Sequence, residues 1–430
     1  MTNMISLIFV DCLSSLPKSC AMRLFRIWLL LVMKLKIMSL NLSLFYILFI
    51  VVYSTSVLAK DEFNTLPGNV FKLSLNTEVG QIDNFLYASQ DEEKTAYLAL
   101  FPTIEIQTQF DRQLFSFDFK SQHRKYQDFS RDDHTNFTLA PSYQYKLAEN
   151  KALFVNASLA NLHEMRGTGL SLGNATSLSK GDELEIFDFS VGYLFGNKES
   201  VAKVKIELGQ FDSKYQTRRE ETYLLDQQKS FADISFDYLL SGQSYFATNV
   251  SFDNISFKHN KLLDKKKYTG LAGVKWQTTE ISQLALLVGY QQIKFANSAF
   301  KDDDGFKWRF DWNWHPIYST KVSLSTERDF EEANRLSNSY RVVDSYNIKI
   351  KSNLTDYFIA TAVIGSKREK IIYQQANEKE NYLFSQFQVN YQRSESLSFY
   401  IKYDYKDLDS SEIIFNNQRN SISIGFDVTI

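Results

Sequence analysis

The chain has 430 residues, a formal net charge of −2, 23% charged residues and 15% aromatic residues. Nothing in it resembles the basic patch or stripe of a nucleic-acid-binding protein. The only two cysteines are Cys12 and Cys20, so a chain processed beyond them has no disulfide framework and no thiolate chemistry. Composition alone leaves a soluble all-β protein and a membrane β-barrel both open.

The N-terminal region has the pattern of a secretory signal peptide. Lys34 and Lys36 precede the apolar run Leu42–Tyr53, and small and polar residues follow as far as Ala59. This order predicts cleavage after Ala59. A membrane anchor is the alternative, but polar residues dilute the stretch Leu40–Leu58.

The first residues of the chain fit no signal-peptide pattern. We interpret the part before Met33 or Met38 as a gene-model extension, with the true start at one of these two methionines. The predicted organisation is then a signal peptide with its extension over 1–59, a short periplasmic segment over 60–70 and a single β domain over 71–430.

Segments that alternate strictly between apolar and polar residues fill the chain after Phe71. The stretch "FKWRFDWNW", for example, sets five aromatic residues against two basic residues, an aspartate and an asparagine, the mark of a strand with one apolar face and one polar face. About eighteen strands are predicted, at 71–80, 95–107, 113–124, 134–147, 152–164, 183–194, 200–213, 230–240, 244–257, 267–278, 283–295, 305–314, 319–329, 339–352, 356–368, 381–392, 396–407 and 420–430.

The connections between these segments alternate in length, eight short and nine long and polar. This layout predicts an all-β fold: a transmembrane antiparallel up-and-down β-barrel with short periplasmic turns and long extracellular loops. A soluble sandwich or propeller would also alternate, but these segments exceed the usual strand length of about five or six residues. Pro102 and Pro141 fall inside predicted strands, so we expect bulges or displaced strand ends there.

The last segment, "NSISIGFDVTI", predicts how the barrel closes. Every second residue from Ile422 to Ile430 is apolar and should face lipid, while the small and polar residues between them should face the lumen. Because lipid cannot satisfy an open strand edge, this segment must pair with the first strand near 71–80.

Charged residues on the polar faces of the strands are predicted to line the pore. Their alternating signs would hold water and contact a polar or anionic glycan; the alternative is that lumen faces are simply polar. An inward Tyr400 could stack on sugar rings or pack in the wall. The predicted pore-lining residues are Asp118, Lys120, Lys203, Lys205, Glu207, Arg309, Asp311, Lys349, Lys351, Tyr400, Lys402 and Asp404.

Three loop stretches stand out. The glycine-rich segment 167–181 is the candidate for a loop that folds into the lumen. The runs Lys265–Lys267 and Asp302–Asp304 are expected to be solvated, or to contact lipopolysaccharide phosphates or divalent cations.

The sequence offers no catalytic or metal-binding pattern. Its five histidines are scattered and match no metal-binding spacing. Neither a nucleophile-elbow motif nor a phosphate-binding loop is present. We therefore predict that the protein is not an enzyme, with no metal and no cofactor.

Three stretches resemble a known family: "HEMRGTGLSLG" (163–173), "STKVSLSTERDF" (319–330) and "YRVVDSYNIKI" (340–350). The chain resembles bacterial β-barrel porins that are often encoded with exopolysaccharide and capsule biosynthesis genes. The loop motif Arg166, Gly167, Thr168 and Gly169 is the most specific part of this resemblance. One departure from outer-membrane barrels in general is the final Ile430, where many such chains end in an aromatic residue.

The resemblance implies an integral protein of the outer membrane that exports exopolysaccharide or capsular polysaccharide. The expected partners are outer-membrane lipid and lipopolysaccharide, the polysaccharide itself, the barrel assembly machinery and a periplasmic or inner-membrane polysaccharide export protein. The alternatives are a general or small-solute diffusion porin and a surface adhesin or receptor barrel without a transport role.

Overall fold

The computed structural model describes residues 69–276, 281–336, 338–374 and 376–430. The predicted signal peptide, the extension before Met33 or Met38 and almost all of the 60–70 segment lie outside the described residues. None of the helices described is long and apolar enough to span a membrane.

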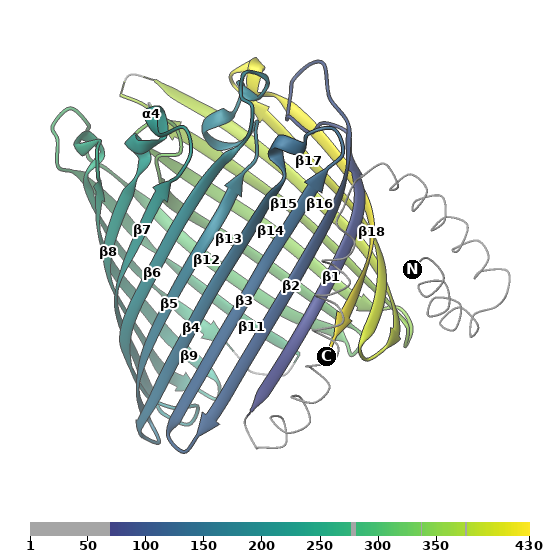
Figure 1. Ribbon diagram of the computed structural model, residues 1–430. Helices are drawn as coiled ribbons and strands as arrows, with labels where there is room; N and C mark the ends of the chain where they lie inside the picture. The colour runs from purple at the N-terminus through teal and green to yellow at the C-terminus, as the bar shows by residue number, and fades with distance from the viewer. Residues whose placement is uncertain (1–68, 277–280, 337, 375) are drawn as a thin grey trace. The chain divides into compact units, whose positions relative to one another are not determined.

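Eighteen antiparallel strands form one sheet that closes on itself (Figure 1). This confirms the predicted closed β-barrel and its strand number. The strands are β1 (Val70–Ile82), β2 (Thr95–Phe110), β3 (Gln113–Tyr126), β4 (His134–Ala148), β5 (Lys151–Glu164), β6 (Asp182–Phe195), β7 (Ala202–Tyr215), β8 (Gln227–Ser241), β9 (Ser244–Phe257), β10 (Lys265–Trp276), β11 (Ser282–Phe295), β12 (Asp303–Ile317), β13 (Thr320–Glu332), β14 (Tyr340–Asn353), β15 (Phe358–Ile372), β16 (Asn377–Ser394), β17 (Leu397–Ser410) and β18 (Asn417–Thr429).

The strands are joined by short turns at one end of the barrel and by long loops at the other (Figure 1). We call the loop end extracellular and the turn end periplasmic, as the layout of such barrels requires. The long loops carry the short helices, which are η1 (Ser130–Asp132), η2 (Gly169–Ser171), η3 (Ala175–Ser177), α4 (Arg219–Thr222), η4 (Tyr223–Leu225), η5 (Lys261–Leu263) and η6 (Ile413–Phe415).

The barrel closes where β18 pairs with β1, as the sequence predicts. The register runs from Ser74 opposite Thr429 to Ile82 opposite Ser421. Beyond it, the backbones of Leu73 and Ile430 exchange hydrogen bonds of 3.0 and 2.8 Å. At the extracellular end the Asn84 amide donates to the Gln418 carbonyl at 2.9 Å, so side chains continue the seam where the strands end.

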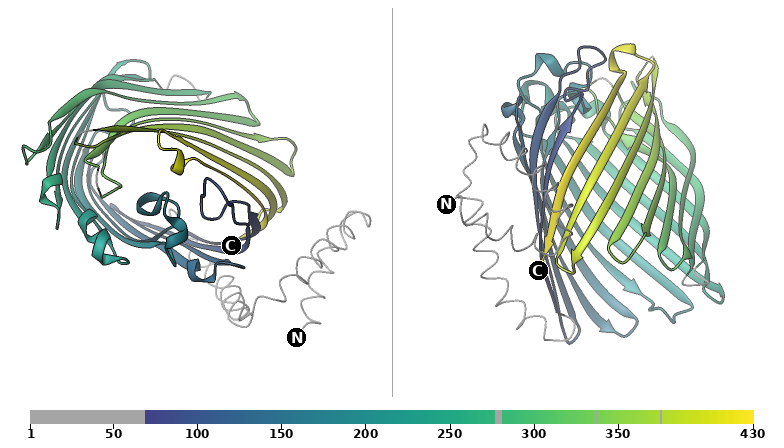
Figure 2. Two further views of the ribbon diagram at one scale, coloured as in Figure 1. Left: turned by 90° about the horizontal axis from the view of Figure 1, so that it is seen from above. Right: turned by 90° about the vertical axis from the view of Figure 1, so that its right-hand side faces the viewer.

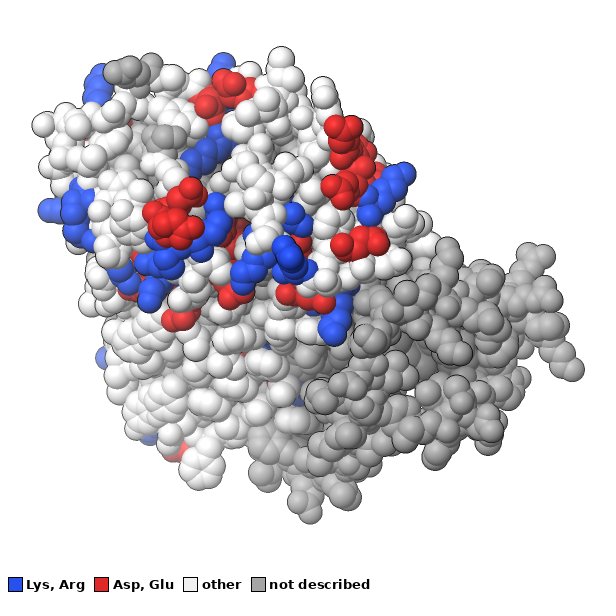
Figure 3. Space-filling view, turned by 45° about the horizontal axis from the view of Figure 1, so that its top comes forward, with Lys and Arg blue, Asp and Glu red and all other residues white. Residues whose placement is uncertain are grey.

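The outer face of the wall is apolar. Ile348 and Ile350 of β14 and Ile422 and Ile424 of β18 are among many large apolar side chains that are at least 40% exposed. So much exposed apolar surface is what a lipid-facing wall requires, and it exceeds what a soluble protein tolerates. Figure 3 shows acidic and basic side chains gathered toward the loop end, above a wall that is nearly free of charge.

The two strand prolines contradict the expectation of bulges or displaced strand ends. Pro102 lies inside β2 and Pro141 inside β4. The β2–β3 and β4–β5 pairings are interrupted beside them and resume in the same register on the other side. A missing N–H therefore removes ladder bonds locally without inserting a residue. The register shifts that do occur, as at Lys146/Ala148 and Leu239/Ser241, lie beside periplasmic turns.

Candidate pore and its extracellular closure

The structure places all twelve predicted pore-lining residues on the polar, inward faces of five strands, β3, β7, β12, β14 and β17. Some are already paired within the wall: Lys205 meets Glu207 at 2.6 Å, and Lys203 donates to the Tyr245 hydroxyl at 3.1 Å. Others make no ion pair within the described part of the chain, and these are Asp118, Lys120, Arg309, Asp311, Lys349 and Lys351. Their contribution to conduction stays a prediction.

Tyr400 is part of the wall rather than a free ring in the lumen. It is 7% exposed, and its hydroxyl donates to Asn76 at 2.9 Å and to Glu78 at 3.2 Å. A ring held in this way has little free face for stacking on a sugar, so the geometry favours packing.

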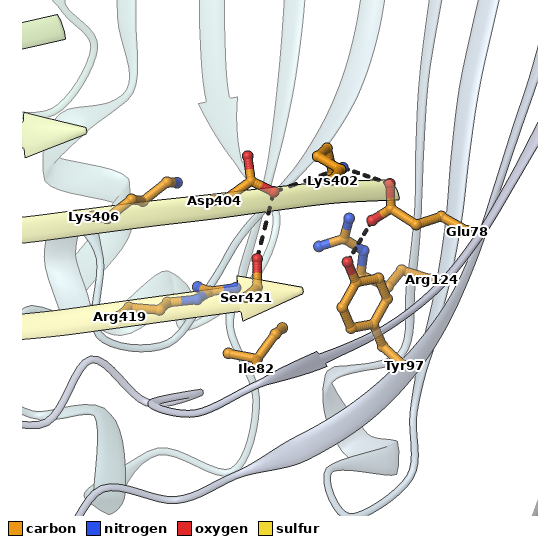
Figure 4. A pocket seen from close by; sticks show the side chains of 9 residues that line it. All are labelled: Glu78, Ile82, Tyr97, Arg124, Lys402, Asp404, Lys406, Arg419 and Ser421. Atoms are coloured by element: carbon orange, nitrogen blue, oxygen red, sulfur yellow. Dashed lines mark hydrogen bonds and ion pairs between the residues drawn. The ribbon is translucent and has the colours of Figure 1, made fainter. Parts of the chain in front are cut away.

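A charged cluster lies on the lumen wall beside the closing seam (Figure 4). It surrounds a pocket of about 170 Å³ and draws its side chains from β1, β2, β3, β17 and β18. Lys402 pairs with Glu78 at 2.5 Å and lies 3.8 Å from Asp404. The lining residues, which we call the seam cluster, are Glu78, Ile82, Tyr97, Arg124, Lys402, Asp404, Lys406, Arg419 and Ser421.

The seam cluster has more positive than negative side chains. Arg124, Lys402, Lys406 and Arg419 face only two carboxylates, those of Glu78 and Asp404. Sequence analysis found Lys402 and Asp404 but missed the other cations and Glu78. The same alternation, continued from Lys120 to Arg124 and from Lys402 to Lys406, would have placed two of them on the inward face.

A second group of cations lies near the periplasmic end of the lumen. Lys321 of β13 stands directly opposite Lys351 of β14, and Ser323 stands opposite Lys349. We call Lys321, Lys349 and Lys351 the mouth lysines. All three are exposed, and among the described residues none has a carboxylate within ion-pair distance. Like charges directly opposite each other destabilise a sheet, so this arrangement carries a structural cost.

The loop motif that the family resemblance singled out, Arg166 to Gly169, holds extracellular loops together through hydrogen bonds and an ion pair. The Arg166 guanidinium donates to the Asp132 carboxylate at 2.6 to 3.1 Å and to the Leu178 carbonyl at 2.8 Å. Both side chains of this ion pair are buried, at 8% and 1% exposure. The pair joins the β5–β6 loop to the β3–β4 loop.

The rest of the motif explains why small residues follow Arg166. Gly167 has a φ of +80°, and a Cβ there would lie 2.0 Å from the Leu86 carbonyl oxygen, so only glycine fits. The Thr168 hydroxyl donates to the Met165 carbonyl at 2.6 Å, and Gly169 also has a positive φ, of +53°. The motif therefore folds the loop against the β1–β2 loop.

Several loops meet inside the ring of strands when the barrel is seen from above (Figure 2). The Phe415 ring of η6 touches Gly173 of the β5–β6 loop, and the Arg335 guanidinium lies 4.8 Å from the centre of the same ring. Leu170 packs against the cluster that holds Leu225, Phe257 and Leu263. The 167–181 segment thus reaches loops from distant strands, in agreement with its prediction as the inward-folding loop.

Ion pairs hold these loops in place. Arg335 pairs with Glu378 at 2.6 Å and also with Glu380. Burial alone would lower the pKa of Arg335, but Glu380 and Tyr373 raise that pKa above its ordinary value. The hydrogen bond to Asp182 likewise raises the pKa of Arg218. Both guanidinium groups therefore stay charged at any physiological pH.

The two charge runs are only partly solvated: Lys266, Asp302 and Asp304 are exposed as predicted, whereas Lys265 is buried. Lys265–Lys267 begins β10, and its alternation turns Lys265 inward, where that ammonium meets Glu332 at 2.7 Å and is 1% exposed. In the acidic run, Asp302 accepts the Phe295 backbone N–H at 2.9 Å, and Asp303 and Asp304 accept tyrosine hydroxyls. Among the described residues, no group of three or more acidic, histidine or cysteine side chains could hold a metal ion.

A closed barrel with an apolar exterior and a charged lumen defines a transmembrane β-barrel of the porin class. The chain belongs to the family described as "Putative beta-barrel porin 2", whose profile matches residues 70–430. None of the curated proteins compared with the chain matches it.

Solved structures similar to the chain are outer-membrane channels and transporters. They include OccK3 of Pseudomonas aeruginosa, with 12% identity, a TM-score of 0.45 and coverage of 84% of this chain and 95% of that one. A BenF-like porin of Pseudomonas fluorescens Pf-5 has 11% identity, a TM-score of 0.48 and coverage of 85% and 100%. The FrpB iron transporter of Neisseria meningitidis has 8% identity, a TM-score of 0.48 and coverage of 86% and 83%.

Proposed function

We propose that this porin is a channel of the outer membrane that conducts an anionic, hydrophilic substrate outward from the periplasm, after cleavage of a signal peptide near Ala59. The observation that carries the proposal is the group of mouth lysines. Lys321 and Lys351 oppose each other without a carboxylate partner among the described residues. An anionic substrate entering from the periplasm would meet them first and relieve their repulsion.

The rest of the lumen supports passage of the same class of substrate. The seam cluster, near the extracellular end, has a surplus of cations around its pocket. Eighteen strands enclose a lumen wider than side chains alone fill, because barrel diameter grows with strand number. The mouth lysines and the seam cluster are thus two positively charged regions at different depths of the same polar lumen.

We further propose exopolysaccharide or capsular polysaccharide as the substrate. Acidic glycans are anionic and strongly hydrated, which suits a lumen of charged and hydroxyl side chains. The resemblance of the 163–173, 319–330 and 340–350 stretches to porins encoded with polysaccharide genes supports the same proposal. The proposed partners are a periplasmic or inner-membrane polysaccharide export protein that delivers the glycan, and the barrel assembly machinery that inserts the chain.

A small-solute diffusion porin is the second candidate, because the loops that meet around Phe415 lie inside the ring of strands. A small anion would need less loop displacement than a polymer. A surface receptor without transport is not favoured by any lumen feature, since its working residues would lie on the loops alone.

A deletion strain and planar-bilayer recordings separate these functions. Export predicts that the deletion strain retains polysaccharide in the periplasm, and that the triple variant K321E/K349E/K351E restores secretion poorly. The K266E variant, which changes an exposed lysine on the outer face of β10, is the matched control and should restore secretion fully. A deletion strain that secretes normal amounts of polysaccharide would exclude export. Anion selectivity of the purified channel in that case would establish the small-solute porin.

A further inference from the structure

The outer face of the barrel carries a patch of charged side chains, which would be costly to bury among lipid acyl chains. On β15, the face that carries Ile364 also carries Arg368 and Lys370, which lie nearer the extracellular end. On β16, the face that includes Leu383 continues as Lys379. Alternation therefore turns these three cations outward, just beyond the lipid-facing belt.

The three cations stand close together and without ion-pair partners. Lys370 lies directly opposite Lys379, and Arg368 lies opposite Asn381 on the same pair of strands. All three cationic side chains are exposed, and none meets a carboxylate within ion-pair distance in the described ranges. A cross-strand pair of like charges such as Lys370 and Lys379 costs stability.

A groove of about 420 Å³ runs beside this patch. It opens where two neighbouring strands diverge: the pairing of β12 with β13 stops at Arg309 opposite Glu327, although both strands continue toward the extracellular end. Side chains satisfy the backbone groups that are freed on β13: the Phe330 N–H donates to Asp329 at 2.8 Å and to Gln291 at 3.3 Å, and the Phe330 carbonyl accepts from Lys267 at 3.3 Å. The outside of the divergence is left as a recess.

The acidic side chains that line the groove have partners of their own, and Glu369 among them pairs with Arg341 at 2.6 Å. Asp344 holds Arg328 at 2.5 and 2.7 Å, while Asp303 and Asp304 accept hydroxyls from Tyr340 and Tyr290. Asp303 and Asp304 keep their negative charge, so the lining side chains without an ion-pair partner in the described ranges are three cations, Arg368, Lys370 and Lys379, against these two aspartates. This favours an anionic ligand over a divalent cation.

We propose that this groove binds the phosphates of a lipopolysaccharide molecule in the outer leaflet. Its position at the extracellular edge of the apolar belt is the depth at which phosphorylated headgroups lie when their acyl chains cover that belt. Arginine and lysine are the side chains that bind phosphate oxygens, and basic clusters beside a membrane-embedded surface bind anionic lipid. A lipid here would also cover the recess left by the divergence of β12 and β13.

The test compares the triple variant R368Q/K370Q/K379Q with the wild-type barrel. Each is extracted from outer membranes, exchanged through detergent and analysed for bound lipopolysaccharide by native mass spectrometry. We expect at least tenfold less lipopolysaccharide per barrel in the variant. K321Q/K349Q/K351Q, which removes as many cations from the lumen, is the matched control and should retain the wild-type amount. R368K/K370R/K379R should restore binding.

A second measurement identifies the source of the phosphate. Barrels refolded into phosphatidylglycerol vesicles should gain thermal stability on addition of lipopolysaccharide, and the glutamine variant should not. Inorganic phosphate at equal phosphate concentration should give no gain; an equal gain would replace the lipid with a free ion and overturn the proposal. Equal lipopolysaccharide retention by the wild type and a heat-modifiable, folded glutamine variant would also overturn it. Unchanged ion selectivity in that variant keeps this result separate from the proposed channel function.

Discussion

The extracellular loops and the periplasmic mouth of the lumen treat their charges in opposite ways. In the loops, cations such as Arg166 and Arg335 are buried or half-buried and matched to carboxylates. At the periplasmic end, Lys321, Lys349 and Lys351 are exposed and unmatched within the described structure. The same residue types therefore fasten loops at one end and present free charge to water at the other. Pairing, rather than composition, distinguishes structural charge from charge available to a substrate.

Removing the closing strand should have the largest effect. Without a closed barrel, neither the extracellular loops nor the periplasmic mouth of the lumen can form. Deletion of residues 421–430 takes away every strand partner of β1 on its β18 side and leaves open edges that lipid cannot satisfy. We expect no folded barrel, measured as the absence of a heat-modifiable band after gel electrophoresis. A folded, heat-modifiable product would show that the seam is dispensable.

Breaking the buried ion pair between Arg166 and Asp132 should have the second-largest effect, because it changes the extracellular loops and leaves the periplasmic mouth unchanged. Arg166→Ala leaves Asp132 buried without its partner, a change that typically costs about 3–5 kcal/mol. The β5–β6 loop should detach, and single-channel conductance should rise severalfold. Arg131→Ala removes an exposed arginine from η1, the short helix that also holds Asp132, and should leave conductance unchanged.

The double variant sharpens this result. If the two side chains act as a pair, Asp132→Ala combined with Arg166→Ala should cost less than the sum of the single changes. Equal conductance in the wild type and the Arg166→Ala variant would mean that this fastening does not restrict the pore.

Reversing the mouth lysines should change selectivity while sparing stability. K321E/K349E/K351E replaces three exposed cations, so the reversal potential in a salt gradient should move toward cation selectivity. The unfolding midpoint should shift little, because exposed charges contribute weakly to stability. K266E on the outer face is the control, and an unchanged reversal potential in the triple variant would contradict the role of this group.

Loosening the loop contact at Phe415 should give the smallest effect. Phe415→Ala removes the ring beside Arg335, and such cation–π contacts contribute about 0.5–2 kcal/mol. We expect more frequent opening events in single-channel records, with a smaller rise in mean conductance than for Arg166→Ala. Phe110→Ala, at the periplasmic end and 76% exposed, should leave the records unchanged.

The fold could be predicted from the sequence because lipid imposes strict alternation on each membrane-crossing strand. The predicted starts differ most from the observed ones where strands continue beyond the apolar belt at the extracellular end. β8 begins at Gln227 and β18 at Asn417, a few residues before the predicted starts. Those added residues, such as Gln228 and Gln418, are polar on both faces because water surrounds them, so alternation disappears.

The site was harder to predict because it depends on contacts between distant strands. Glu78, Arg124 and Arg419 meet in one pocket although they come from β1, β3 and β18. Alternation can assign each to the inward face, but only the register between strands brings them together. The Arg166–Asp132 pair has the same origin, since nothing in the loop motif itself indicates which carboxylate completes it.

The closing seam sets how this chain reaches its native state. Every strand pairs with its sequence neighbours through a turn or loop, whereas the Asn84 amide and the Gln418 carbonyl are 334 residues apart. Contacts at such separation slow folding, because the entropy of a long loop is lost before the contact forms. We therefore expect the seventeen hairpin pairings to form before the last one, leaving a nearly complete sheet with two bare edges until β1 and β18 meet. On this view the encounter of β1 with β18 sets the rate at which finished pores accumulate.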